Sequence, residues 1–346
     1  MKRGELITPT GRLVVSAEEM RQDRPGWLAA RRKTGKGAYR IGASEVPSIL
    51  DLDGVDTPAH VYRRKVHGIE TPVNEAMTFG TLLEPVIAQE WAVRNRVDRI
   101  DEIGLVARDG DPWAVATIDR RVFRCPIHKT TADGECLCEV KNMSHGTASR
   151  WHRDIPDRIL AQMIFQLWVT GYPHGHLAAL DGGNRLKQMT IYADRERELT
   201  EYVVTEVRRF LVKNLEAGVE PSWSNEKPDR MIELDNATHP ERSGVVELDL
   251  DGIGEVMDYA QLAADAGAAE KRRKQAGARL RQLSGGAEVA KFSGERAFWY
   301  GEGSKPTVDL EMLKERWPDA YDAVVGETAF PVLHIDAAYK PGKRSK

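Results

Sequence analysis

The stretch Leu137-Cys138-Glu139-Val140-Lys141 constrains the fold more than any other part of the chain, because apolar and polar residues alternate along it. Alternation with a period of two is typical of a β-strand. Successive side chains on a strand point to opposite faces, so Glu139 and Lys141 share one face, about 7 Å apart. A carboxylate that can hold a divalent metal therefore stands beside an ammonium group that can orient a water molecule.

Two further carboxylates precede this strand. Asp119 ends a second candidate strand, which runs over 113–119, and Glu84 lies in a candidate helix. The backbone carbonyl of Val140, between the two motif side chains, is a further oxygen ligand. Oxygen donors from separate elements form the kind of site that Mg²⁺ or Mn²⁺ occupies. The pattern therefore favours metal-dependent hydrolysis of phosphodiester bonds.

Composition places the chain among globular proteins. It has 346 residues, of which 41% are apolar and 30% charged, and its net charge is −3. This balance excludes a uniformly basic DNA-coating protein, but not an enzyme that combines an acidic metal site with local basic patches. The chain contains no apolar run long enough for a membrane span and begins without the apolar stretch of a signal peptide. We therefore expect a cytoplasmic protein that does not bind membranes.

The order of the expected elements predicts an α/β fold with a mixed central sheet flanked by helices. We expect helices over 78–96, 158–170 and 194–216, and strands over 100–107, 113–123, 135–142, 176–180 and 189–192. Composition changes after the last helix, so we place a boundary near residue 230, between a core over 1–229 and an extension over 230–346. In the extension we expect a long exposed helix or helical pair over 253–284, a hairpin over 287–301 and a short helix over 307–325.

Two expected helix starts lie close to the candidate chemistry. Ser44 is a suitable N-cap for a short helix that ends near Leu50. Thr81 can cap the helix over 78–96, with Pro85 near its start. Glu84 then lies in the first turn, where the helix dipole favours a carboxylate.

The three cysteines form the pattern Cys125-x2-His128-x7-Cys136-x-Cys138, which raises the possibility of a zinc site. Cys138 shares a strand face with Val140 and should point into a core. Cys125 and His128 lie in an expected hairpin loop. We favour the core interpretation for these cysteines over zinc binding by these four residues, and a disulfide framework is not expected in a cytoplasmic protein.

Six elements in the same order make residues 24–215 similar to a known family. They are Trp27 with Arg31, Ile41-Gly42-Ala43-Ser44-Glu45, Phe79-Gly80-Thr81-Leu82-Leu83-Glu84-Pro85, Ala116-Thr117-Ile118-Asp119, Glu139-Val140-Lys141, and Ala161-Gln162-Met163 followed by Trp168-Val169-Thr170-Gly171. The chain resembles the YqaJ-like viral recombinases, which are lambda-exonuclease-like members of the PD-(D/E)XK nuclease superfamily.

The resemblance implies a Mg²⁺- or Mn²⁺-dependent exonuclease that digests double-stranded DNA from its 5′ ends. It implies a ring-shaped homo-trimer and a single-strand annealing protein as partner, for phage-type recombination. Its metal ligands match Glu84, Asp119 and Glu139, and its motif lysine matches Lys141. Its helix glutamine near the metals matches Gln162, and its residues for the 5′-phosphate match Arg31 and Ser44. The chain departs from the family beside the aspartate, where Ile118 and Arg120 replace the usual Pro and Gly.

Other interpretations stay open at this point. Glu139 and Lys141 can be an ordinary ion pair, and Gln162 and Gln166 can both be solvated. The same core can belong to an endonuclease or a single-strand nuclease. It can also belong to a non-catalytic protein that binds DNA ends.

Overall fold

The structure, a computed structural model, describes residues 2–52, 56–69, 74–125, 134–144, 151, 155–223, 227–239, 241–301, 309–325 and 333–341. The chain divides into two compact units, residues 1–238 and 239–346. Helix α9 (Pro228–Thr238) belongs to the first unit, because its Met231 and Leu234 bury against Ala59. The division therefore falls after this helix, whereas the sequence had placed it near residue 230.

The first unit alternates helices and strands in an α/β order. Its elements are β1 (Gly11–Ser16), α1 (Ala17–Gln22), α2 (Arg24–Arg32), β2 (Ile41–Gly42), a 3₁₀ turn (Ala43–Glu45), α3 (Val46–Ile49), α4 (Pro58–His67), α5 (Glu75–Arg94), β3 (Arg99–Asp101), β4 (Gly104–Arg108), β5 (Asp111–Ile118), β6 (Arg120–Phe123), β7 (Cys136–Met143), α7 (Asp157–Thr170), β8 (His174–Asp181), β9 (Arg185–Tyr192), α8 (Arg197–Phe210), a π-helical turn (Leu211–Glu216) and α9.

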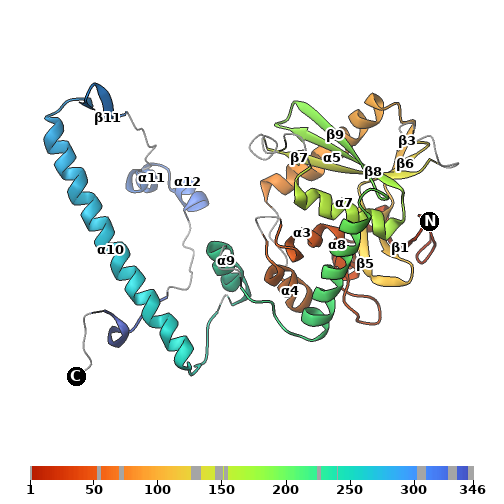
Figure 1. The fold of residues 1–346 in the computed structure, drawn as a ribbon, viewed down its shortest axis with the longest axis horizontal. Helices are drawn as coiled ribbons and strands as arrows, with labels where there is room; N and C mark the ends of the chain where they lie inside the picture. Colours follow the sequence, from red (N-terminus) through yellow and green to blue (C-terminus); the bar gives the residue numbers. More distant parts are fainter. Residues whose placement is uncertain are drawn as a thin grey trace. The chain divides into compact units, whose positions relative to one another are not determined.

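The described strands of the first unit form two sheets (Figure 1). One has the order β1-β4-β5-β2, and the other has the order β3-β6-β7-β8-β9. Strand β7 runs parallel to β8 and β2 runs parallel to β5, while the other pairs are antiparallel. The predicted α/β class with a mixed sheet is therefore confirmed.

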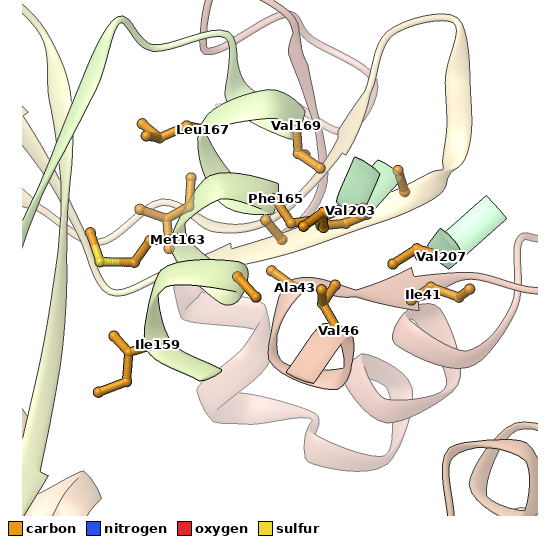
Figure 2. Close-up of a cluster of buried hydrophobic side chains, with 14 of the residues drawn as sticks. Ile41, Ala43, Val46, Ile159, Met163, Phe165, Leu167, Val169, Val203 and Val207 are labelled. Atoms are coloured by element: carbon orange, nitrogen blue, oxygen red, sulfur yellow. The ribbon is translucent and has the colours of Figure 1, made fainter. Parts of the chain in front are cut away.

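The five-stranded sheet is covered by helices on both faces. On one face, Leu137 of β7 and Leu177 of β8 join a core to which α7 contributes Met163 and Phe165. Figure 2 shows side chains of α7 in this core beside Ala43, Val46, Val203 and Val207. On the other face, α5 packs through Ile87, Ala88 and Trp91 against Cys136, Cys138 and Val140 of β7. Alternate residues of β7 thus enter different cores, as the alternation in the sequence requires.

Two strands expected from the sequence are each broken where the chain passes between the sheets. The stretch 100–107 divides into β3 and β4, and the stretch 113–123 divides into β5 and β6, with Asp119 at the break. Gly104 makes the first crossing possible, because its φ is +99° and a Cβ there would lie 2.3 Å from the carbonyl oxygen of Val15. A local apolar pattern does not reveal such a crossing, since both halves are equally strand-like.

The second unit contains a single long helix, α10 (Leu250–Ser284), rather than a helical pair. The hairpin of β10 (Val289–Phe292) and β11 (Glu295–Trp299) follows, and then the short helices α11 (Leu310–Arg316) and α12 (Pro318–Val324). Among the described residues of this unit, Ala260 is the one buried apolar side chain.

Candidate active site

The residues singled out by the sequence all line one cavity of the first unit. It has a volume of about 490 Å³, and its walls include Arg31, Ser44, Glu84, Asp119, Glu139, Val140, Lys141 and Gln162. A larger hollow of about 890 Å³, lined largely by α7 and α8, contains none of them. The smaller cavity is therefore the candidate active site.

Asp119 reaches this cavity because it occupies the break between the two sheets. It follows the last residue of β5 in one sheet and precedes β6 in the other. Its Oδ2 accepts a hydrogen bond of 2.8 Å from the backbone N–H of Val140, in the middle of β7. This bond fixes the Asp119 carboxylate beside the strand that carries Glu139 and Lys141.

Glu139 is held by donors on both of its oxygens, although it is only 2% exposed. Its Oε1 accepts from Nζ of Lys141 at 2.5 Å and from Nε2 of Gln162 at 2.6 Å. Its Oε2 accepts from Nε2 of Gln166 at 2.7 Å. Glu139 and Lys141 therefore do share one face, and their side chains touch.

Gln166 was not predicted to be a site residue. Gln166 is fully buried on α7, one turn after Gln162, and not solvated. Its spacing of four residues from Gln162 puts both amides on one helix face. A polar residue within the otherwise apolar stretch Met163-Ile164-Phe165-Gln166-Leu167 was the available signal. Such a residue is buried only when it has a hydrogen-bond partner.

Glu84 lines the same cavity, but its helical setting differs from the prediction. Helix α5 begins at Glu75 with Asn74 as its N-cap, so Thr81 caps nothing and Pro85 lies inside the helix. Glu84 is therefore beyond the first turn, and the helix dipole does not explain its position. The predicted start at residue 78 is therefore too late, because Asn74 caps the helix before that residue.

Arg120 forms an ion pair with Glu84. Its guanidinium lies 2.7 Å from Oε1 of Glu84 and 2.5 Å from the carbonyl oxygen of Asp119. This is the position where the resemblance led us to expect glycine. The departure therefore places a buried cation at the edge of the acidic cluster.

The charges of the cluster oppose one another in the absence of a cation. Burial raises the pKa of Asp119 well above its usual range, and repulsion from Glu139 and Glu84 adds to this effect, while Lys141 and the N–H of Val140 oppose it. For Lys141, burial lowers the pKa, but attraction to Glu139 and Asp119 outweighs burial and leaves the pKa raised. A protonated lysine beside crowded carboxylates is the result.

These donors fit a hard divalent cation. Carboxylates of three separate elements and the backbone at Val140 meet at one cavity, and all of them are oxygen donors. A bound cation would relieve the repulsion that raises the pKa of Asp119. Asp119, Glu139, Glu84 and Val140 are the residues that would hold it.

Arg31 and Ser44 meet on the wall of the same cavity. Nη2 of Arg31 donates a hydrogen bond of 2.9 Å to Oγ of Ser44, and the guanidinium lies 5.2 Å from the ring centre of Trp27. Ser44 is not an N-cap, because it lies within the 3₁₀ turn Ala43–Glu45. Its hydroxyl is therefore directed to Arg31 instead of to a helix N-terminus.

A buried ion pair supports this wall. Glu45 Oε2 accepts from the backbone N–H of Gly42 at 2.8 Å and lies 2.7 Å from Nζ of Lys65. Burial raises the pKa of Glu45, but the positive charges of Lys65, Arg31 and Arg64 lower it by more than burial raises it. The pKa of Glu45 is therefore below its usual range. Burial lowers the pKa of Lys65 more than Glu45 raises it. The pair thus fixes the turn that carries Ser44.

The residues around this cavity lie in a stretch that is similar to a known family. Residues 26–173 match the family described as the YqaJ-like viral recombinase domain. The matched stretch contains every residue of the candidate site, from Arg31 to Gln162, as well as Gln166.

Individual relatives extend this similarity. The chain is 24% identical over 331 residues to the uncharacterized protein YqaJ of Bacillus subtilis (strain 168), covering 92% of this chain and 96% of the relative. It is also similar to an alkaline exonuclease from Laribacter hongkongensis, at 21% identity and a TM-score of 0.42, over 60% of this chain and 98% of the other. For a phage-related exonuclease from Haemophilus somnus 129PT, the identity is 11% and the TM-score 0.35, over 52% and 96% of the two chains.

Within the part of the chain that the structure describes, every helix is too short or too polar to cross a membrane.

Proposed function

We propose that the YqaJ-like domain is a divalent-metal-dependent deoxyribonuclease that digests linear duplex DNA from its 5′ ends. One observation carries this proposal: Asp119, Glu139, Lys141 and Gln162 converge on a single cavity that Arg31 and Ser44 also line. The family supports a role in phage-type recombination, in which 3′ single strands are passed to an annealing protein. A homo-trimer that encircles its duplex is part of the same proposal.

Phosphodiester hydrolysis needs a nucleophilic water and neutralised charge on the phosphoryl oxygens. A Mg²⁺ or Mn²⁺ ion held by Asp119, Glu139 and Glu84 would neutralise charge on the phosphoryl oxygens and would make a nearby water more acidic. Lys141 donates a hydrogen bond that orients the attacking water, while Glu139 holds the lysine in place through the contact already present. Gln162 fixes Glu139 from α7 and keeps its Oε1 directed at the cavity.

Arg31 and Ser44 allow the cavity to select which end of the substrate it binds. A guanidinium and a hydroxyl 2.9 Å apart form a suitable receptor for a terminal phosphate. Their place on the wall of the same cavity as the carboxylates favours cleavage close to a phosphorylated 5′ end. This arrangement favours an exonuclease over an endonuclease or a single-strand nuclease.

Digestion of three substrates with Mg²⁺ tests the proposed activity. Linear duplex, nicked circle and single strand are incubated in parallel, and we expect stepwise release of mononucleotides from linear duplex. Cutting of circles would favour an endonuclease, faster digestion of the single strand would favour a single-strand nuclease, and binding without products would favour a DNA-end-binding protein.

Replacement of Lys141 tests the role of the motif lysine. We expect Lys141→Ala to lower the cleavage rate by about 100-fold or more while duplex binding is largely kept, because water orientation is lost but charge neutralisation is not. Lys213→Ala changes an exposed lysine of the same unit and serves as the control. Digestion by Lys141→Ala at the parent rate would contradict the assignment.

Replacement of Arg31 or Ser44 tests the phosphate receptor. We expect Arg31→Ala and Ser44→Ala to lose the preference for 5′-phosphorylated over 5′-hydroxyl ends. Arg24→Ala is the matched control, because Arg24 lies on the same helix and also stacks on Trp27, with its guanidinium 5.7 Å from the ring centre. Equal rates on both kinds of end in the parent protein would rule out the receptor.

A further inference from the structure

Four metal-binding side chains meet in the interior of the first unit, away from the carboxylate cavity. The Sγ atoms of Cys125 and Cys136 and one ring nitrogen each of His174 and His176 all lie within 4.8 Å of one another. All four residues are buried. The sequence had grouped Cys125 and Cys136 with His128 and Cys138, so the histidines of β8 were not anticipated.

Cys138, one of those two expected partners, does not join the cluster. Cys138 is buried on the same face of β7, as expected, and its Sγ lies 3.9 Å from the carbonyl oxygen of Glu139. His128 lies outside the described residues. The two histidines come from a strand about 50 residues from Cys125 in sequence, so only the pairing of β7 with β8 brings them near.

The local backbone explains why the four side chains converge. The N–H of Cys125 donates to the carbonyl oxygen of Gly134 at 2.7 Å, which closes the loop between β6 and β7. His174 and His176 alternate with Gly175 along β8 and therefore share one face. The opposite face is crowded at this point, since a Cβ at Gly175 would lie 2.8 Å from Leu137.

The distances suit a tetrahedral metal site. The Sγ atom of Cys125 lies 3.2 Å from Nε2 of His176 and 3.4 Å from Nε2 of His174. Zinc bonds of about 2.3 Å to sulfur and about 2.0 Å to nitrogen place neighbouring ligands of a tetrahedron about 3.3–3.8 Å apart. Ligand atoms gathered within 4.8 Å reach those separations by small side-chain rotations.

A hydrogen bond behind the cluster orients one of its ligands. Nδ1 of His176 lies 2.9 Å from Oγ1 of Thr190 on the neighbouring strand β9. This contact leaves Nε2 directed at Cys125. Metal-binding histidines commonly have such a partner on their second nitrogen, because it fixes the ring.

We propose that Cys125, Cys136, His174 and His176 bind one structural zinc ion. Two thiolates and two imidazoles form a closed ligand set of the kind that holds structural zinc, whereas the carboxylates of the other cavity favour a hard cation. The ion joins the end of β6, the start of β7 and β8. It thereby stabilises, from the opposite face, the strand that carries Glu139 and Lys141.

The zinc content of the full-length protein tests this proposal. The protein is expressed in zinc-supplemented medium, purified without metal-affinity chromatography, and analysed for zinc by mass spectrometry. We expect about one zinc per chain in the parent protein. We expect Cys136→Ser and His176→Gln to lose most of it. Cys138→Ser, a buried cysteine two residues along the same strand face, should keep it, as should Asp119→Asn in the carboxylate cavity.

Cobalt substitution keeps the proposal testable even where a variant fails to fold. Parent protein reconstituted with Co²⁺ should give the absorption bands of tetrahedral cobalt and a thiolate-to-metal charge-transfer band. Absence of both zinc and these bands from the parent protein would overturn the proposal. Zinc retained by Cys136→Ser and His176→Gln would overturn it too, as would a thiol titration that finds Cys125 and Cys136 joined in a disulfide.

Discussion

Gln166 allows a sharp test of how the fold holds the Glu139 carboxylate. Gln166→Leu keeps a side chain of similar size on α7 but removes the N–H donor that lies 2.7 Å from Oε2 of Glu139. The second contact of this amide, 3.3 Å to the carbonyl oxygen of Thr117, is weaker and is also lost. The buried Oε2 atom of Glu139 is then left without the donor that Gln166 supplies.

The expected magnitude follows from the charge on the acceptor. A hydrogen bond to a charged group contributes about 1.5–3 kcal/mol, against about 0.5–1.5 kcal/mol between neutral groups. Gln166→Leu also removes Oε1 of Gln166, a buried acceptor with no partner among the described residues, and this offsets part of the loss. Gln166→Leu is therefore compared in the parent protein and in Glu139→Gln. This comparison isolates the part of the change in free energy of unfolding that depends on Glu139.

The assay is therefore a double-mutant cycle with Glu139→Gln, measured by thermal unfolding in EDTA. The free energy of unfolding should fall by about 1 kcal/mol more for Gln166→Leu in the parent than in the Glu139→Gln background. For a unit of this length, that difference corresponds to about 2–4 °C in Tm. Gln188→Leu on β9, whose amide contacts Asn95, is a control outside the cluster.

Equal losses of Tm in the two backgrounds would refute the reasoning. Such a result would mean that Gln166 stabilises the fold through packing or through Thr117, and that the charge of Glu139 is irrelevant to it. Unequal losses for Gln166→Leu, with equal effects of Gln188→Leu in the two backgrounds, would establish Gln166 as a positioning residue for the carboxylate.

Two further predictions concern the charged groups around the cavity. The raised pKa of Asp119 means that the folded state binds a proton more tightly than the unfolded state, so without metal its contribution to stability falls as pH rises above the usual range of an aspartate. Because a cation competes with that proton, the increase in Tm caused by Mg²⁺ should grow as pH rises above the usual range of an aspartate, and it should vanish in Asp119→Asn. A pH-independent increase would contradict this. Glu45→Gln should cost about 3–5 kcal/mol in free energy of unfolding, because it leaves Lys65 buried without its carboxylate. Chemical denaturation measures this cost, and Glu45→Gln/Lys65→Met should recover part of it; no recovery would show that the charge of Lys65 is not the cause.

Much of the site was accessible from sequence because its residues lie in regular, local patterns. The alternation around Glu139 and Lys141 predicted a strand with both side chains on one face, and their contact in the structure follows from it. The burial of Cys138 on the opposite face follows from the same period of two. Periodicity requires only neighbouring residues, so it can be traced without knowledge of the fold.

Helix starts and strand breaks were less accessible, because they depend on competing signals. Asn74 caps α5 well before Thr81, and the expected strand over 113–123 divides at Asp119 between two sheets. Both stretches satisfy the local preferences of the element that was predicted. Packing against distant segments decides where α5 begins and whether the stretch 113–123 forms one strand or two.

The sequence by itself determined the α/β class and the strand face shared by Glu139 and Lys141, and it predicted the residues that meet in the candidate cavity. Only the tertiary structure decided which residues surround them: Gln166 on Glu139, Arg120 on Glu84, and His174 and His176 beside Cys125. Each of these contacts joins residues that are far apart along the chain. No local pattern encodes them, because strand pairing and helix packing bring their partners together only in the folded protein.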